Sequence, residues 1–382
     1  MIGPEIRDRA GALRVESLDL LESLVRVNSH SAHPEGINRV GQLVLDSLPA
    51  SMSVTFAADG NGVRHHVAAG PCGREEKILL VGHLDTVFPY RGTGEPFETG
   101  GGRVVGPGTA DMKGGVVVMI QALKILDGLG LLDRVPIQCL FNGDEEVGSP
   151  FSSRMVRELG KNASCGLVFE AGGLGNQLVT SRRGVIRYDL TCTGKARHAG
   201  VKEGPKASAI VEMARLILAL EELNDQERGV SINVGTVKGG VANNIVPDQA
   251  QARFEFRFRD PDTEREILAR FDEIVKSVST PGCGARMDLL HRRPGMVPTP
   301  ATDELVTVVL DAAGELGQSV VTQSRGGASD GNFLTEMGVP VIDGLGPVGD
   351  LDHSADEYIV EQSLHDRIAL TALLLCKLAG IA

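Results

Sequence analysis

The chain has 382 residues, of which 42% are hydrophobic and 23% are charged, and its formal net charge is −12. This length exceeds the size that one hydrophobic core usually reaches, so we expect two domains in an ordinary globular protein. The acidic balance and the lack of a basic patch exclude the usual footprint of a nucleic-acid-binding protein.

The N-terminal segment and the cysteines bear on location. The segment MIGPEIRDRAGALRVESLDLL carries acids where a signal peptide needs an apolar core. No run approaches the roughly 20 apolar residues of a membrane span. Six scattered cysteines form no C-x-x-C pair. We therefore expect a cytoplasmic protein with reduced, buried thiols, no membrane partner and no cysteine metal ligand.

The first half of the chain has an α/β pattern. Apolar spacing predicts two helices within residues 15–48, on either side of the polar break VNSHSAHPEG. Short apolar runs at 77–81, 135–141 and 166–169 are typical of strands, and residues 112–126 are predicted to form a helix. The order strand, helix, strand, strand predicts a buried, mixed and largely parallel sheet.

The pattern changes at about residue 182. Residues 185–193, 231–237 and 251–259 alternate apolar and polar side chains as antiparallel strands do, and helices are predicted at 206–223 and 262–278. The α/β pattern returns with a helix at 303–316, a Gly-rich loop at 325–331 and a strand at 339–343. We therefore predict one domain formed by residues 1–181 and 293–382, interrupted by an α+β domain at 182–292.

Several potential metal ligands lie at the ends of predicted strands or in the loops beyond them. A lone histidine is usually structural, but several carboxylates at one sheet edge repel one another unless cations neutralise them. A histidine with several acids and no cysteine predicts a hydrolytic metal site with enough ligands for two divalent ions. The candidates are His83, Asp111, Glu146, Glu170 and His353.

Asp85 and the adjacent pair Glu145 and Glu146 each have two interpretations. Asp85 is placed to accept the second N–H of the His83 ring, or else to cap the turn at Thr86. In an extended segment Glu145 and Glu146 would point in opposite directions, so one would bind metal while the other faced the attacking water as a general base. The alternative for this pair is a solvated acidic turn.

Seven motifs follow one another in a single order: GHLDTVFP, GPGTADMKGG, NGDEEVGS, FEAG, TGKARHAG, GGVANNIVPDQAQARFEFR and DHSADEY. Together they resemble the M20 family of metallopeptidases and amidohydrolases, from about residue 17 to the C-terminus, and within it most of all the glutamate carboxypeptidase (carboxypeptidase G2 type) branch. The resemblance implies a zinc-exopeptidase-like catalytic domain at 1–181 and 293–382. It also implies a lid or dimerisation domain with an antiparallel sheet at 182–292.

The resemblance also implies a set of metal ligands. Two zinc ions per subunit would be bridged by Asp111, with His83 and Glu170 on one ion and Glu146 and His353 on the other. Cobalt or manganese would fit the same ligands.

Two further roles and one backbone feature follow from the same resemblance. Glu145 would be the general acid and base that deprotonates the bridging water and later protonates the leaving amine. Asp85 matches the residue that orients the metal-bound histidine. The peptide bond Asp111–Met112 is expected to be cis.

The inserted domain supplies the substrate residues that the resemblance implies. His198 matches a histidine that reaches the partner subunit's active site and stabilises the oxyanion, so a homodimer through the lid is expected. Asn244 and Arg257 match positions that contact the substrate carboxylate, and Arg293 and Arg325 are weaker candidates. Glutamate-specific members carry a lysine at the position of Gln177, and Arg182 and Arg183, which follow closely, are the alternative cations for its role.

These observations predict a dizinc hydrolase that cleaves an amide bond beside a free carboxylate and releases a C-terminal amino acid of the glutamate type. The substrate is then a small or dipeptide-like molecule. The alternative is an N-acyl-amino-acid deacylase of the acetylornithine or succinyl-diaminopimelate type, which would need acids instead of a cation facing the leaving side chain. A more remote alternative, a non-catalytic binding module, predicts that Glu145 or a metal ligand is lost, and all are present.

Overall fold

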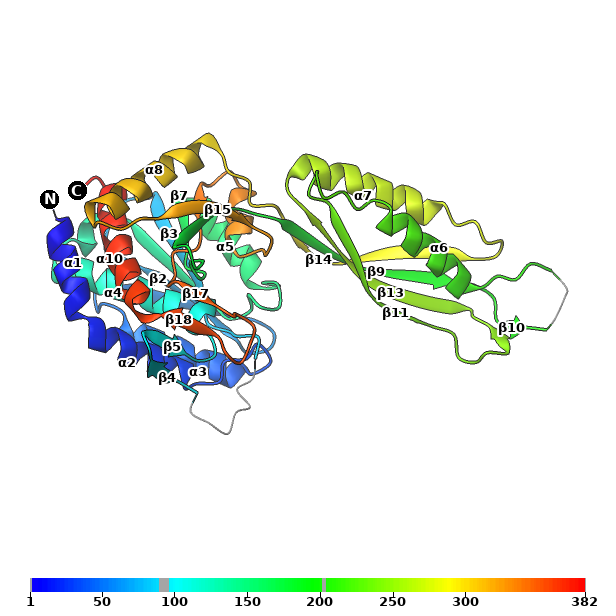
Figure 1. Cartoon of the computed structure of the whole chain (residues 1–382), viewed down its shortest axis with the longest axis horizontal. Coiled ribbons are helices and arrows are strands. Elements are labelled where there is room, and N and C mark those ends of the chain that lie inside the picture. Colours follow the sequence, from blue (N-terminus) through cyan, green and yellow to red (C-terminus); the bar gives the residue numbers. More distant parts are fainter. Residues whose placement is uncertain (1, 89–95, 201–203, 382) are drawn as a thin grey trace. The chain divides into compact units, whose positions relative to one another are not determined.

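The computed structural model describes residues 2–88, 96–200 and 204–381, so Pro89, the last residue of the GHLDTVFP motif, lies outside it. The chain divides into two compact units (Figure 1). The first comprises Met1–Ser181, Pro298–Arg325 and Ser329–Ala382, and the second comprises Arg182–Val297 and Gly326–Ala328. The second unit therefore runs on to Val297 rather than ending at residue 292, and the catalytic and lid roles of the predicted domains stay predictions.

The first unit is built on a six-stranded sheet with the strand order β1-β2-β6-β3-β7-β16. Strands β6, β3, β7 and β16 are parallel neighbours, whereas β1 pairs with β2 and β2 with β6 in antiparallel fashion. The predicted mixed, largely parallel sheet is confirmed. Its strands are β1 Ser53–Ala58, β2 Arg64–Ala69, β3 Lys77–His83, β6 Ile137–Asn142, β7 Ala163–Val168 and β16 Val341–Ile342.

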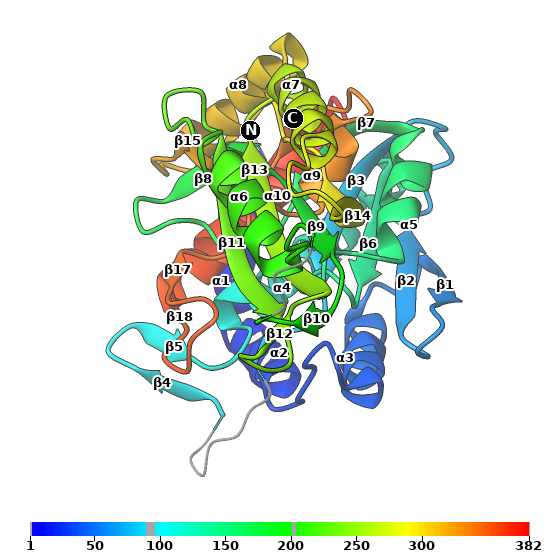
Figure 2. The ribbon, with the colours of Figure 1, turned by 90° about the vertical axis from the view of Figure 1, so that its right-hand side faces the viewer.

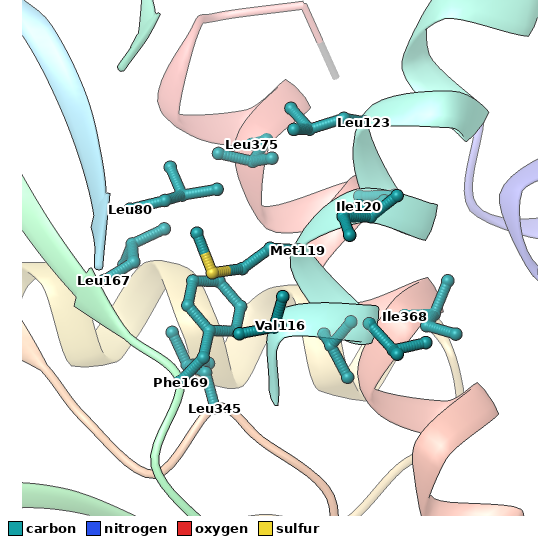
Figure 3. Close-up of a cluster of buried hydrophobic side chains, with 14 of the residues drawn as sticks. Leu80, Val116, Met119, Ile120, Leu123, Leu167, Phe169, Leu345, Ile368 and Leu375 are labelled. Carbon is teal, nitrogen blue, oxygen red and sulfur yellow. The ribbon is translucent and has the colours of Figure 1, made fainter. Parts of the chain in front are cut away.

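Helices α4 (Gly114–Gly128) and α10 (Glu361–Leu378) contact each other and form much of the core of this unit. Nearly all of α4 is buried because its sequence, GGVVVMIQALKILDG, is apolar on every side. Figure 3 shows Met119 of α4 in the same hydrophobic cluster as Leu80 of β3 and Leu375 of α10. The sheet edge described below is therefore held by a rigid, close-packed interior.

The first unit also contains shorter elements around this core. A four-stranded sheet has the order β17-β18-β5-β4, and β8 pairs with β15. The helices are α1 Gly3–Ala12, α2 Arg14–Val25, α3 Pro34–Ser47, α5 Ser152–Gly160, α8 Pro300–Glu315 and α9 Gly331–Thr335, with the short turns η1 Thr109–Lys113 and η2 Leu132–Arg134. The strands are β4 Glu98–Gly100, β5 Arg103–Val105, β8 Gln177–Arg182, β15 Val321–Arg325, β17 Gly349–Asp350 and β18 Tyr358–Val360.

Several of these elements were not predicted from the sequence. Helix α1 was missed because its sequence, GPEIRDRAGA, is mostly polar and buries few side chains. The hairpin β1–β2 was missed because β1 is exposed along almost its whole length and shows no apolar alternation. Helices α5 and α10 were also not predicted, and the strand expected at 339–343 is reduced to the two residues of β16.

The second unit is an antiparallel sheet with helices packed on it (Figures 1 and 2). Along β13, buried and more exposed residues alternate, which places Phe254 and Phe256 in the core against Phe271 of α7, with ring centroids 5.5 and 5.4 Å apart. The predicted antiparallel sheet is confirmed. Its order is β11-β13-β9-β14, with β9 Gly184–Thr193, β11 Ser231–Gly239, β13 Gln249–Phe258 and β14 Gly284–Arg293. The unit also contains α6 Ala209–Glu221, α7 Pro261–Lys276 and the short pair β10 Arg197–His198 and β12 Ile245–Val246.

The structure bears on two expectations from the sequence, those about membrane spans and about free thiols. Among the described residues, no helix combines the length and the apolar character needed to cross a bilayer. All six cysteines are unpaired, and all except the partly buried Cys283 are buried. The prediction of free thiols is confirmed.

We expect the buried ring of His66 on β2 to make the fold sensitive to mild acid. His66 is 5% exposed, and neither ring nitrogen has a hydrogen-bond partner among the described residues. Burial, and then the charges of Arg64 and His65, lower its pKa from 6.5 to about 4. In the unfolded chain the His66 ring therefore binds a proton near pH 6.5, whereas in the folded chain it binds this proton only near pH 4. Stability present above pH 6.5 is lost as pH falls through this window, by about 3 kcal/mol at most.

Urea unfolding at pH 7.5 and pH 4.5 tests this prediction. The variant His66→Leu should lose about 2–3 kcal/mol less stability on acidification than the wild type does. His33→Leu, at an exposed histidine, is the matched control and should behave like the wild type. An unchanged acid response in His66→Leu would contradict the prediction.

Candidate metal centre

Three neighbouring parallel strands of the first unit end at the same edge of the sheet. Strand β3 ends at His83, β6 at Asn142 and β7 at Val168. The acidic loop at 144–146 follows β6, and Glu170 follows β7. Because the carboxyl ends of parallel strands lie together, these loops converge on His83, at the edge where α/β proteins usually carry their sites.

Asp111 lies between two histidines. It belongs to η1, the turn before α4, and its peptide bond to Met112 is cis, as expected. His83 Nε2 lies 2.8 Å from Asp111 Oδ1, and His353 Nε2 lies 3.1 Å from Asp111 Oδ2. Each oxygen of one carboxylate thus faces a different imidazole, which is the arrangement required of a bridging ligand.

Two glutamates complete the set. Glu170 Oε1 lies 3.8 Å from His83 Nε2, and Glu146 Oε2 lies 3.4 Å from His353 Nε2. The structure therefore brings the five predicted ligands together, in two groups that share Asp111. Their role as ligands remains a prediction.

The donor atoms of these residues suit divalent cations. One atom each of His83, Asp111 and Glu170 lie within 4.8 Å of one another, as do atoms of Asp111, Asp352 and His353. Imidazole and carboxylate donors in such groups are typical of zinc, and cobalt or manganese accept them as well. Asp352 was not singled out from the sequence, although it lies next to His353 in the DHSADEY motif.

The acids of this centre are buried against one another. Burial, and then the charge of Asp111, raise the pKa of Glu146 to about 8, and the same two causes raise the pKa of Glu170 well above its usual range. For Asp111, burial acts upward, but the hydrogen bonds with His353 and His83 outweigh it and hold its pKa far below the usual range. Crowded buried carboxylates are stable when cations neutralise them, so these residues fit two divalent ions.

Asp85 is fully buried, but its carboxylate has other partners than the sequence suggested. His83 Nδ1 lies 2.9 Å from the main-chain carbonyl oxygen of Asp85 and 3.5 Å from its Oδ1. The carboxylate accepts the N–H groups of Glu145 and Glu146, both at 3.2 Å, and the hydroxyl of Ser31 at 2.8 Å. Asp85 therefore orients His83 chiefly through its carbonyl, and its carboxylate anchors the acidic loop.

Glu145 and Glu146 lie in a turn and not in an extended segment. The expectation that they point in opposite directions therefore had the wrong geometric basis. The turn is closed by hydrogen bonds from Gly148 N–H to the Glu145 carbonyl and from Ser149 N–H to the Asp144 carbonyl, both 2.7 Å. Glu145 is 8% exposed, and its charge contributes to the raised pKa of Glu146.

A buried hydrogen-bond network that sequence reasoning missed holds this turn. Asp330 accepts the Asn142 amide at 2.7 Å and the Ser149 hydroxyl, so it joins the end of β6 to the end of the turn. Asp144 accepts the N–H and the hydroxyl of Ser152 at the start of α5. The only sequence signal for Asp330 was its place in the Gly-rich loop at 325–331.

Glu357 is a second residue that sequence reasoning missed. Its carboxylate is 5% exposed and accepts the N–H groups of Gly108, Ala110 and Asp111, each at 2.8 Å. It therefore fixes the main chain on which Asp111 is carried. Its place in the DHSADEY motif was the available signal.

Two of the predicted substrate residues lie at one end of the second unit. His198 is exposed on β10, and its Nδ1 accepts the N–H of Gly200 at 3.1 Å. With Nδ1 as the acceptor, the neutral ring carries its proton on Nε2, the form that donates a hydrogen bond to an oxyanion. The Asn244 carbonyl accepts the N–H of Ala199 at 2.8 Å, which places Asn244 beside this segment.

The two arginines of the second unit that were predicted to bind substrate, Arg257 and Arg293, differ in exposure. Arg257 on β13 donates to Glu255 at 2.7 Å and to the Gly326 carbonyl at 3.0 Å, and its side chain is 33% exposed. Arg293, the last residue of β14, is only 5% exposed. Neither substrate role is tested by these contacts.

Arg325 lies in the first unit, close to the metal centre. It donates to the carbonyl of Ala171, the residue after Glu170, at 2.9 Å. It also lines a cavity of about 260 Å³ with Ala110, Asp350 and Asp352. One cation and two acids therefore surround a space next to the candidate ligands.

Two histidines around one shared carboxylate, at the carboxyl edge of a parallel sheet, define a metal-dependent hydrolase. Residues 79–377 match the sequence profile of peptidase family M20/M25/M40. The chain belongs to this family and is a hydrolytic enzyme of the metallopeptidase and amidohydrolase class. The resemblance drawn from the seven motifs is confirmed.

Two of the curated relatives carry names that denote different activities. Carboxypeptidase G2 of Pseudomonas sp. (strain RS-16) is 30% identical over 372 residues, covering 94% of this chain and 88% of that protein. Succinyl-diaminopimelate desuccinylase of Novosphingobium aromaticivorans is 27% identical over 337 residues, covering 80% of this chain and 84% of that protein.

The fold is shared with solved structures of the same family. A dinuclear metal-binding peptidase of the M20 family from Bacillus subtilis, the YXEP protein, superimposes with a TM-score of 0.71 at 14% identity. The match covers 97% of this chain and all of that one. At this identity the likeness speaks for the fold alone.

Proposed function

We propose that this protein is a dizinc hydrolase that cleaves an amide or peptide bond beside a free carboxylate and releases a C-terminal amino acid of the glutamate type. The observation that carries the proposal is Asp111, whose two carboxylate oxygens face His83 and His353. A single carboxylate between two histidines suits a pair of metal ions better than one ion.

In this proposal His83 and Glu170 hold one ion, Glu146 and His353 hold the other, and Asp111 is shared. When bound, two zinc ions supply Lewis-acid polarisation of the scissile carbonyl and lower the pKa of the attacking water. Cobalt or manganese would serve with the same ligands.

Glu145 moves the proton in this scheme. It takes a proton from the attacking water and later delivers it to the nitrogen of the leaving amine. Asp85 accepts the N–H groups of Glu145 and Glu146, so one buried carboxylate sets the position of the base and of its neighbouring ligand. His83 is oriented by the carbonyl of the same Asp85.

Recognition of the substrate carboxylate is assigned to three arginines and one asparagine. Arg325 lines a cavity beside the centre in the first unit, and Asn244, Arg257 and Arg293 of the second unit are further candidates. An arginine suits this task because its planar fork binds a carboxylate through two hydrogen bonds.

A second candidate is an N-acyl-amino-acid deacylase of the acetylornithine or succinyl-diaminopimelate type. The specific observation in its favour is that Asp350 and Asp352 line the same cavity as Arg325. Acids at this place would accept the amino group of a basic leaving residue. The similarity to a succinyl-diaminopimelate desuccinylase supports the same alternative.

The test is hydrolysis by the zinc-loaded enzyme of two matched substrate series. N-acyl dipeptides and N-acyl amino acids are compared with glutamate, leucine, ornithine and diaminopimelate at the leaving position. The proposal expects the highest kcat/KM for a C-terminal glutamate. A preference for ornithine or diaminopimelate would favour the deacylase, and failure to hydrolyse any amide would overturn both.

We also propose a cytoplasmic homodimer joined through the second unit. The cytoplasmic location is supported by the six unpaired thiols. The dimer is supported by His198, which is exposed and belongs to a different unit from the candidate ligands. In a dimer this ring would stabilise the oxyanion in the partner's site.

Mixed dimers test the role of His198. His198→Ala should lower kcat by about 100-fold or more, because one oxyanion donor is lost. Coexpression of inactive Glu145→Gln with His198→Ala should then restore part of the activity, since each mixed dimer retains one complete site. His33→Ala, at an exposed histidine of the first unit, is the control. Purified mixed dimers without recovered activity would place His198 in its own chain's site or outside catalysis.

A further inference from the structure

A second cavity of about 410 Å³ lies in the first unit, away from the metal centre. It is enclosed by α1, the turn after α8 and the first part of α10, close to both chain termini in Figure 1. None of the candidate ligands or substrate residues lines it. Its volume exceeds that of a free amino acid.

The floor of this cavity contains a buried histidine without partners. His365 on α10 is 4% exposed, and neither of its ring nitrogens is hydrogen-bonded within the part of the chain that the structure describes. A buried polar group without a partner costs free energy, so its retention calls for an occupant. A neutral imidazole offers one donor and one acceptor to such an occupant.

A cation, Arg7, also lines the cavity. Arg7 on α1 makes one hydrogen bond, to the Leu316 carbonyl at 3.4 Å, and it takes part in no ion pair among the described residues. The neighbouring Arg14 differs, because it is paired with Glu361 at 2.6 Å. Within the described residues, Arg7 therefore lines this cavity as a cation that no carboxylate pairs with, although Asp366 lines the cavity as well.

We propose that this cavity is an effector site for a small carboxylate anion of amino-acid size. Arg7 pairs with the carboxylate, and His365 donates a hydrogen bond to it. Asp366 lines the same cavity and accepts the Gln362 amide at 3.0 Å, so an acid is also present to receive an ammonium group. A free amino acid satisfies all three groups, whereas a simple carboxylate satisfies the first two.

Two connections join this site to the metal centre. Asn176, which lines the cavity, donates to the Ser319 carbonyl at 2.6 Å and belongs to the loop that follows Glu170. Helix α10, which carries His365, begins directly after β18 and shortly after Glu357, the residue that holds the main chain at Asp111. An occupant of the cavity therefore contacts both segments that lead to the ligands.

Calorimetric titration of the metal-loaded protein with L-glutamate, acetate and inorganic phosphate tests the site. Arg7→Gln is compared with Arg9→Gln, a matched control on the same helix, where Arg9 pairs with Glu5 and does not line the cavity. Wild type and Arg9→Gln should share a carboxylate site that Arg7→Gln weakens by about tenfold or more. Glutamate binding more tightly than acetate identifies an amino acid as the ligand. Equal carboxylate affinity in all three proteins, or phosphate as the only anion bound, overturns the proposal.

A second variant separates binding from folding. His365→Leu loses no hydrogen bond, so its melting temperature should equal or exceed that of the wild type, while carboxylate binding falls. A lowered melting temperature with unchanged binding overturns the role of His365. The carboxylate should also change kcat or KM in Arg9→Gln and not in Arg7→Gln, and an identical response in both overturns the coupling. L-glutamate is also the product of the proposed reaction, but its binding at the metal centre would be the same in Arg7→Gln and Arg9→Gln. The difference between these two variants therefore does not depend on the proposed function.

Discussion

Replacement of Glu145 by Gln is expected to lower kcat by at least about 100-fold while the bound metal stays unchanged. Gln keeps the volume of the side chain and removes the group that takes the proton from water. Glu145 is held by its main-chain N–H on Asp85, a contact that the substitution leaves in place. The loss should therefore fall on kcat and not on KM.

Kinetics and elemental analysis of the same protein preparation check this prediction. Glu158→Gln on α5, at an exposed residue, controls for a general effect of the substitution. Glu146→Gln supplies the contrast, because it should lose metal as well as activity. Wild-type kcat in Glu145→Gln, or loss of its metal, would remove Glu145 from the role of base.

Asp111→Asn is expected to reduce bound metal at both positions together. The Asp111 carboxylate is the only group that faces both His83 and His353 among the described contacts, and an amide carries no charge to share between two ions. Turnover should fall by at least about 1,000-fold, because the metal contributes several kcal/mol to the reaction. Metal content, measured by mass spectrometry, should fall from two ions per chain toward none.

Two controls separate an effect of Asp111→Asn on the fold from its effect on metal binding. Glu357 binds the main chain of Asp111, so the loop should stay anchored and the melting temperature of the metal-free protein should change little. Asp352→Asn is the matched control, and it should keep both ions if Glu146 is the ligand beside His353. Loss of a single ion in Asp111→Asn would show that Asp111 does not bridge.

The candidate ligands could be picked out because their residue types and strand-end positions are local features of the sequence, and the structure brings them together. His83 follows a buried apolar run, and Glu170 follows another, so strand geometry alone places them at one edge. The parallel core strands were predictable for the same reason. By contrast, β1 and α1 have little apolar patterning, so their residues do not predict a strand or a helix.

The supporting contacts were not predictable because their partners lie far apart in sequence. Asp330 bonds to Asn142 and Ser149, and Glu357 bonds to residues 108–111. A single sequence contains no signal that links one residue of such a pair to the other. The Asp85 carboxylate illustrates the same limit, since local spacing pointed to His83, which it lies near, but not to the N–H groups of Glu145 and Glu146 that it accepts.

The inserted second unit has a consequence for the biosynthesis of the enzyme. Four of the candidate ligands precede the insertion, whereas His353, Asp330 and Glu357 follow it. A nascent chain that has left the ribosome only as far as the insertion therefore carries an incomplete centre, without the second histidine and without the anchors of the acidic turn and of Asp111. If these residues are the metal ligands, the complete site forms only after the C-terminal segment, whose helix α10 contacts α4, has been synthesised.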